Sequence, residues 1–319
     1  MLPHTHTPHQ GIPKGTIAGH VFPGSVILLL GLHWAAGIGR CIAVGAPYSR
    51  SWHALPWQRG VGARPWEPWL KVFFTFFMGI LMELYYKDPW KYGLDWWWRP
   101  LISEDGAHFT FVDSWHHACM HLAFLACGLL ELGGFYLAAK GYASPLQCSL
   151  ELAMLALAFA LETIMGVLHA LGGEGLPAEI HKMQTLFFTV AAAAAISEAS
   201  HGGHARIAPF VRVTATVAAG VWMCFNALVY AWQSNGNSAW ARDPMAAHVL
   251  VVYAVVIVYV SIVLVGVFIG ASSVIARYCS GDRLLIHPGK SPLRAVQPDL
   301  EVASIDGDLP TPPPSPSPA

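Results

Sequence analysis

The run HVLVVYAVVIVYVSIVLVGVFIGASSVIA, residues 248–276, decides the fold class of this chain. It contains no aspartate, glutamate, lysine or arginine, and it exceeds the about 20 residues that an α-helix needs to cross a bilayer. Of the 319 residues, 55% are hydrophobic and only 12% are charged, whereas a soluble protein carries about 25% charged residues. The composition therefore predicts an integral membrane protein with several spans.

Apolar runs of membrane-spanning length recur along the whole chain. They cover residues 20–38, 66–86, 114–139, 147–168, 177–199, 207–231 and 246–276. A backbone inside lipid must satisfy its own hydrogen bonds, and these runs are too long for barrel strands, so each is predicted to be a helix. The sequence predicts an all-α membrane protein, a bundle of seven transmembrane helices over 20–277. A polar His- and Pro-rich tail (1–19) precedes it, and a Pro-rich, disordered tail (278–319) follows.

The basic residues orient this predicted bundle. If the N-terminus is outside or lumenal, the inner segments carry Arg40, Arg50, Arg59, Arg64, Lys140, Arg206, Arg277, Arg283, Lys290 and Arg294. The outer segments then carry Lys14, Lys87, Lys91, Arg99 and Arg242. Because lysine and arginine accumulate on the cytosolic side, the N-terminus is predicted outside and the C-terminus in the cytosol. The sequence does not identify which membrane holds the protein.

Composition and small motifs also indicate partners. A net charge of -1 excludes a nucleic-acid partner, which would require a basic surface. The lipid bilayer is the predicted environment, and the tryptophans at 96–98 are typical of an aromatic belt at its interface. Gly266 and Gly270 stand at GxxxG spacing, which predicts close helix packing within the bundle or in a homo-oligomer. The Pro-rich tail is a candidate docking segment for a cytosolic adaptor.

Histidines and acids gather near the predicted outer ends of several spans. His117 and His121 are four residues apart, about 6 Å along one helix face, as in many helical zinc sites. Glu162 and His169 are seven apart, about 10.5 Å of rise, and nearly eclipsed around the axis. Ionisable groups inside a membrane are candidates for function. The predicted metal ligands, with zinc as the expected ion, are His117, His121, Glu162, His169 and His181, and the predicted supporting residues are His20, Glu83, His116 and His248.

Two other interpretations of these residues stay open. The same side chains could form a polar hydrogen-bond network without a metal. They could also form part of a path for protons or substrate. Glu131 and Glu198 fall in the inner half of the predicted bundle, where structural pairing with basic residues or Ser197 is expected. His33 stands alone on an apolar helix and is predicted to be a packed, hydrogen-bonded core residue.

Several of these motifs together resemble the transmembrane protein 45 family, which includes the transmembrane epididymal proteins. The resemblance rests on GHVFPG at 19–24, Glu83 in GILMEL, and His117 and Met120 in WHHACM; it also rests on Glu162, His169, His181 and Glu198. It covers residues 19–278 and implies a multi-pass membrane protein without a settled biochemical activity. The chain departs from the family pattern at Leu171 and Glu179, where members carry histidines, and in the apolar region around Ile257 and Val258. His121 and His248 are not positions of the family pattern.

Three functions are compatible with the sequence. The first is a non-enzymatic membrane protein with a metal-stabilised or polar outer core. The second is an intramembrane metal-dependent hydrolase that acts on a lipid through a metal-activated water. The third is a transporter of protons or metal ions, in which Glu131 and Glu198 continue a path from the outer cluster. Whether the protein is an enzyme is not decided by its residues.

Overall fold

The computed structural model describes residues 14–46, 48, 65–86, 97–103, 106–140, 142, 147–172, 176–201, 205–234 and 245–284. The helices up to Cys279 belong to one compact unit. In chain order they are α1 (Lys14–Val44), α2 (Trp66–Phe73), the π-helix η2 (Phe74–Leu81), α3 (Met82–Leu84), α4 (Val112–Ala139), α5 (Gln147–Gly172), α6 (Leu176–His201), α7 (Ala208–Ser234) and α8 (Ala246–Leu284). Strands β1 (Tyr85–Tyr86) and β2 (Trp97–Trp98) form a short antiparallel pair between α3 and α4.

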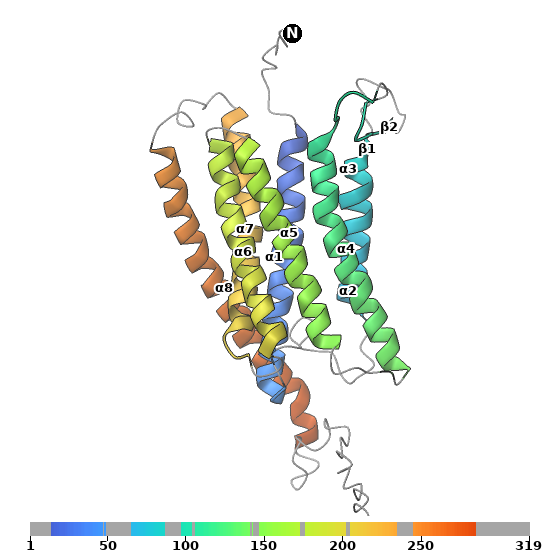
Figure 1. Ribbon diagram of the computed structural model, residues 1–319. Coiled ribbons are helices and arrows are strands. Elements are labelled where there is room, and N and C mark those ends of the chain that lie inside the picture. The colour runs from blue at the N-terminus through green and yellow to red at the C-terminus, as the bar shows by residue number, and fades with distance from the viewer. Residues whose placement is uncertain are drawn as a thin grey trace, which may run out of the picture. The chain divides into compact units, whose positions relative to one another are not determined.

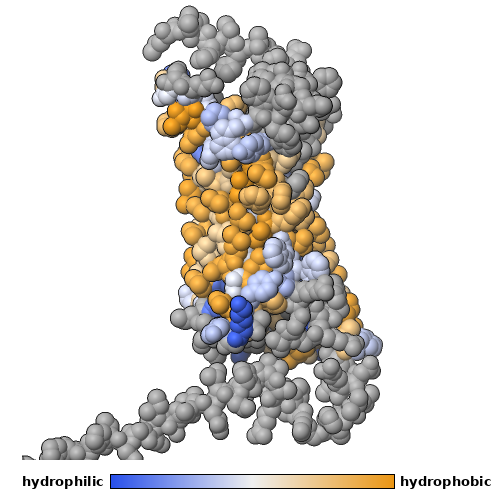
Figure 2. Space-filling view, turned by 90° about the vertical axis from the view of Figure 1, so that its right-hand side faces the viewer, coloured by the Kyte–Doolittle hydropathy of each residue, from blue (hydrophilic) through white to orange (hydrophobic). Residues whose placement is uncertain are grey.

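The helices of this unit lie side by side and alternate in direction (Figure 1). We call the end at which α1, α4, α6 and α8 begin the upper end, and the other end the lower end, as they stand in Figure 1. A belt of hydrophobic residues lies between more hydrophilic residues at the two ends (Figure 2). This distribution is the one that a bilayer requires of the helices that cross it.

In the part of the chain that the structure describes, five helices are long and apolar enough to cross a membrane, as a multi-pass membrane protein requires. These candidate spans are Gly19–Val44, Ser114–Ala138, Gln147–Leu171, Ala208–Ala231 and Ala246–Cys279. The other two predicted spans differ for physical reasons. The helical rod from Trp66 to Leu84 is divided by η2, so no single α-helical piece of it reaches spanning length. Helix α6 carries Glu179, Lys182 and Glu198, which lower its hydropathy.

Most helices extend beyond the predicted spans, and the extension is largest in the first and last helices. Helix α1 begins at Lys14, inside the segment assigned to the N-terminal tail, and α8 continues to Leu284. Hydropathy marks only the apolar part of a helix, whereas backbone hydrogen bonds continue into its polar turns. Span limits derived from hydropathy are therefore shorter than the helices that contain them.

Close backbone contacts and a common apolar core hold the bundle together. Helix α1 packs most extensively on α7, and α5 on α6. At Gly24 of α1, an added Cβ would lie 2.8 Å from the Cβ of Met223 on α7, so only glycine permits this approach. At Gly39, an added Cβ would meet the Ile269 backbone oxygen of α8. The core between the two ends includes the fully buried Trp34, Phe159, Phe188, Ile180 and Trp222.

Candidate functional site: a row of histidines at the upper end

Four imidazoles from four different helices lie in a row near the upper end. His117 of α4 is stacked near His169 of α5, with ring centroids 5.4 Å apart. His169 is stacked near His181 of α6 at 5.5 Å. His181 meets His20 of α1 edge to face at 6.1 Å. We call His20, His117, His169 and His181 the histidine row.

The four histidines lie in a row because each is close to the end of its helix that lies at the upper end of the bundle. His20, His117 and His181 lie in the first turns of helices that begin at the upper end, and His169 lies in the last turn of α5, which finishes there. Antiparallel neighbours therefore bring all four to one depth. The short connection from α5 to α6 brings His169 and His181 together in space.

Polar side chains flank both ends of the row. Glu83 Oε1 lies 3.2 Å from His117 Nδ1, within hydrogen-bond distance. The Tyr230 ring lies 5.2 Å from the His20 ring. His116 also contacts the row, with its ring 5.6 Å from that of His169. The His169 Nδ1 donates to the Met165 backbone oxygen at 3.3 Å if that nitrogen carries the proton, which leaves Nε2 as the acceptor.

His121 and Glu162 lie beside the row. An added Cβ at Gly79 of η2 would overlap the His121 ring, so the imidazole packs directly against the backbone of the π-helix. His121 interacts electrostatically with Glu83 and His117. Glu162 is buried and interacts electrostatically with His117. The structure thus gathers the five predicted ligands and three of the four predicted supporting residues in one region.

His248 is the predicted supporting residue that lies elsewhere. It is exposed on α8 and lines a groove of about 140 Å³ together with Glu179 and Met183. Within the described residues, no three His, Cys, Asp or Glu side chains are arranged as ligands of one metal ion. The members of the row are adjacent, but their nitrogens do not converge on one point.

A second set of ionisable residues lies in the lower half, in which sequence reasoning anticipated the pairing of Glu131 and the hydrogen bond of His33 but missed Glu67 and Lys71. The Lys71 ammonium of α2 donates to Glu131 Oε1 at 2.6 Å and Oε2 at 2.8 Å, and it lies 2.8 Å from Glu67 Oε1. Glu67 also accepts from the Trp34 indole nitrogen at 2.7 Å, and its other oxygen lies 2.8 Å from His33 Nε2. We call His33, Trp34, Glu67, Lys71 and Glu131 the lower charge network.

A buried ion pair from two more helices adjoins this network. Arg212 Nε of α7 donates to Glu198 Oε1 of α6 at 2.6 Å, and both side chains are fully buried. The Arg212 guanidinium carbon lies 4.7 Å from the Trp34 ring centroid. Glu131 and Glu198, for which basic partners were expected, therefore bond Lys71 and Arg212. The four-residue spacing of Glu67 and Lys71, and the lone arginine in the run 207–231, were the signals that could have revealed these partners.

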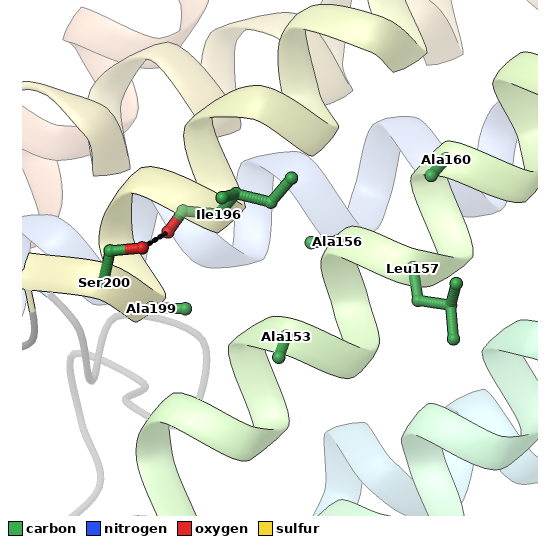
Figure 3. A pocket seen from close by; sticks show the side chains of 7 residues that line it. All are labelled: Ala153, Ala156, Leu157, Ala160, Ile196, Ala199 and Ser200. Carbon is green, nitrogen blue, oxygen red and sulfur yellow. Dashed lines mark hydrogen bonds between the residues drawn. The ribbon is translucent and has the colours of Figure 1, made fainter.

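An apolar groove lies away from the histidine row. It measures about 390 Å³ and lies between the lower halves of α5 and α6, where alanines dominate its lining (Figure 3). The only polar side chain in it is Ser200, whose hydroxyl donates to the Ile196 backbone oxygen at 2.9 Å. An apolar groove of this kind fits hydrocarbon but supplies no group for chemistry.

This chain was compared with protein-family models and with curated protein sequences. No protein-family model matches it, and no curated protein sequence matches it significantly. The functional conclusion therefore rests on the arrangement of the residues described above.

Proposed function

We propose that this protein is a seven-span membrane protein that binds a divalent transition-metal ion at the histidine row. The observation that carries the proposal is the meeting of four imidazoles from α1, α4, α5 and α6 at one depth. Isolated histidines at helix ends are common, but here four helices each present one to the same region, where rotation of the side chains would turn their nitrogens toward one ion. Neutral imidazoles are favoured ligands of zinc and other first-row metals.

The spacing of successive rings suits pairs of neighbouring ligands on one ion. With zinc–nitrogen bonds of about 2.0–2.1 Å in a tetrahedral site, neighbouring imidazole centroids lie about 5 Å apart. The centroids in the row are 5.4, 5.5 and 6.1 Å apart. Imidazoles turn about two side-chain torsions, so an ion would gather these nitrogens by side-chain rotation on a fixed frame of helices. Glu83 and Glu162 would supply the negative charge that a divalent cation requires.

The seven-span part of the proposal is supported by the packing of the two less apolar segments. Helix α6 packs between α5 and α7, and the rod α2–η2–α3 packs along α4. Each runs beside helices that are long and apolar enough to cross a membrane. The basic residues favour an outer N-terminus, so the histidine row would lie in the outer half. On its motifs, we further infer membership in the transmembrane protein 45 family.

Metal analysis of the purified full chain tests the proposal. Wild-type protein in nanodiscs, supplied with zinc and then passed over a chelating column, is expected to retain about one zinc ion per chain. A His169→Ala, His181→Ala variant is expected to lose it. The matched control is His201→Ala, an exposed histidine at the opposite end of α6, and it should retain the ion. Equal and near-zero zinc in all three proteins would overturn the proposal.

A second candidate function, transport of protons or metal ions, is favoured by the lower charge network. Its acids and cations continue the ionisable residues of the bundle into the lower half. Flux of zinc or protons into proteoliposomes, followed with an enclosed indicator dye, separates the two candidates. Flux that His169→Ala abolishes would favour transport. Retained zinc without flux above empty liposomes would favour a resident metal site.

A further inference from the structure

Residues 97–103 and 106–112, between α3 and the start of α4, are joined by backbone hydrogen bonds and present apolar side chains outward. We call these described residues the upper hairpin. We propose that the upper hairpin is a membrane-interface anchor that lies in the headgroup and upper acyl region of the bilayer. The inference does not depend on the proposed metal site, but it rests on the proposed crossing of the membrane by the rod α2–η2–α3.

Backbone hydrogen bonds make the upper hairpin a built element. Ile102 and Phe109 face each other in an antiparallel bridge. The Ser103 amide donates to the His108 carbonyl at 2.9 Å, and the Thr110 amide donates to the Leu101 carbonyl at 2.8 Å. These bonds satisfy backbone groups internally, which is the condition for placing non-helical backbone near lipid.

Further bonds fix the upper hairpin to the two neighbouring helices. The Arg99 amide donates to the Leu84 carbonyl of α3 at 2.9 Å. On the other side, the Trp115 indole of α4 donates to the Arg99 carbonyl at 3.1 Å, and the Arg99 guanidinium donates to the Ser114 hydroxyl. The hairpin is thereby held at the depth where α3 finishes and α4 begins. Figure 1 shows β1 and β2 beside the upper ends of these two helices.

Most of the large side chains on the outward face of the upper hairpin are apolar, and His108 is exposed beside them. The exposed fractions are 45% for Trp98, 37% for Leu101, 53% for Ile102, 76% for Phe109, 52% for Phe111 and 37% for Val112. Phe111 adopts a left-handed backbone conformation, with φ 49°, which bulky residues rarely adopt. An apolar set on a rigid element marks a surface that is covered in use.

The bilayer is the occupant that the surroundings favour. The exposed apolar surface continues from the hairpin onto the rod below it, through Tyr85, Met82, Phe77 and Phe73, which are all exposed. The same medium that covers the rod therefore reaches the hairpin. Its tryptophan, aromatic and aliphatic side chains, with the Arg99 guanidinium 5.8 Å from the Phe111 ring centroid, are typical of the membrane interface.

Photo-crosslinking of the full chain in phospholipid nanodiscs tests the inference. Benzoylphenylalanine is placed at Phe109, at Leu129 in the middle of α4 as the lipid reference, and at Tyr142 as the reference beyond the end of α4. After illumination, intact-mass analysis counts lipid adducts. We expect the adduct yield at 109 to be of the same order as at 129 and about tenfold or more above that at 142.

Two results would overturn the inference. A yield at 109 as low as at 142 would place the hairpin in water. Crosslinking from 109 to a second chain, without lipid adducts, would assign the surface to a homo-oligomer. Zinc content measured on the same samples should not change with the label at 109, so failure of the anchor and failure of the metal site are separately visible.

Discussion

The Trp34 side chain contacts charged groups of both the lower charge network and the Arg212–Glu198 ion pair. Its indole nitrogen donates to Glu67, while the Lys71 ammonium and the Arg212 guanidinium lie 5.4 and 4.7 Å from its ring centroid. Cations near an aromatic ring are stabilised most when both are removed from water, as they are here. The Trp34 side chain of α1 thus contacts ionised groups of both α2 and α7 in the buried interior.

Replacement of Lys71 should destabilise the protein, because it removes the cation from between two buried carboxylates. Lys71→Met leaves Glu67 and Glu131 buried without their ammonium donor, so we expect a loss of about 3–5 kcal/mol in the free energy of unfolding. Equilibrium unfolding in mixed micelles would measure it. Lys182→Met is the matched control, because Lys182 pairs with Glu179 at the surface, where a loss below about 1 kcal/mol is expected. Equal stability of Lys71→Met and wild type would contradict the buried network.

A double variant distinguishes a lost ion pair from a general packing defect. Adding Glu131→Leu to Lys71→Met removes one of the carboxylates that the first change left without a cation. We expect part of the lost stability to return, because replacing both partners of a buried pair with apolar groups is often close to neutral. If the two losses simply add, Lys71 and Glu131 do not act on each other.

Among the elements, the apolar helices were predicted most reliably and the less regular ones least. The run over 246–276 lies within α8, since a long stretch without charge fixes a helix of spanning length by itself. The second span was predicted as one helix over 66–86, yet it changes to a π-helix at Phe74. A π-helix depends on tertiary contacts such as that of His121 with Gly79, which periodicity along one segment does not report.

The crossing of α1 and α8 yields a test at the same scale. Gly39→Ala should place a methyl group against the Ile269 carbonyl, so α8 must shift and the Ser273 hydroxyl loses its 2.8 Å bond to the Gly39 carbonyl. We expect about 1–3 kcal/mol of destabilisation in the same unfolding experiment. Gly133→Ala is the control, because a Cβ there meets nothing within 4 Å. Comparable stability for both variants would mean that the helices do not cross closely at Gly39.

The same comparison bears on the predicted GxxxG contact. An added Cβ at Gly266 or Gly270 of α8 would meet nothing within 4 Å, so this pair does not mediate close packing inside the bundle. The interpretation that is left for the motif is contact with a second copy, which stays a prediction. Crosslinking of Gly266→Ile and Gly270→Ile variants in membranes would show whether it holds.

For the whole molecule, the number of spans is the property to measure first. Epitope tags inserted at 174 and 203 bracket α6, and tags at 55 and 92 bracket the rod α2–η2–α3. With seven spans and an outer N-terminus, impermeant antibodies should reach tags 92 and 174 in intact cells and tags 55 and 203 only after permeabilisation. If the two tags of a pair were reached from the same side, the enclosed segment would not cross the membrane.

The sequence predicted which residues of the candidate site lie at the same depth in the bundle, but not which side chains contact each other. Knowing which helix ends share a face was enough to group His117, His169 and His181, because antiparallel helices of similar length align their ends. The partners of Glu131 were not predictable, since Lys71 stands 60 residues earlier and reaches it only through the packing of α2 on α4. Which side chain meets which across two helices depends on their rotation, and apolar length carries no information on rotation.

The π-helix η2 determines how the two ends of the rod α2–η2–α3 are rotated relative to each other about the rod axis. An α-helix turns about 100° per residue, so a wider-wound segment changes the direction in which everything beyond it points. Glu67 and Lys71 precede the eight residues of η2, and Glu83 follows them. The winding of Phe74–Leu81 therefore fixes the angle about the rod axis between the side chains of Glu67 and Lys71 and that of Glu83, which reaches His117. If those residues rewound as a regular α-helix, Glu83 would turn away from the histidine row while the lower end of the rod kept its place.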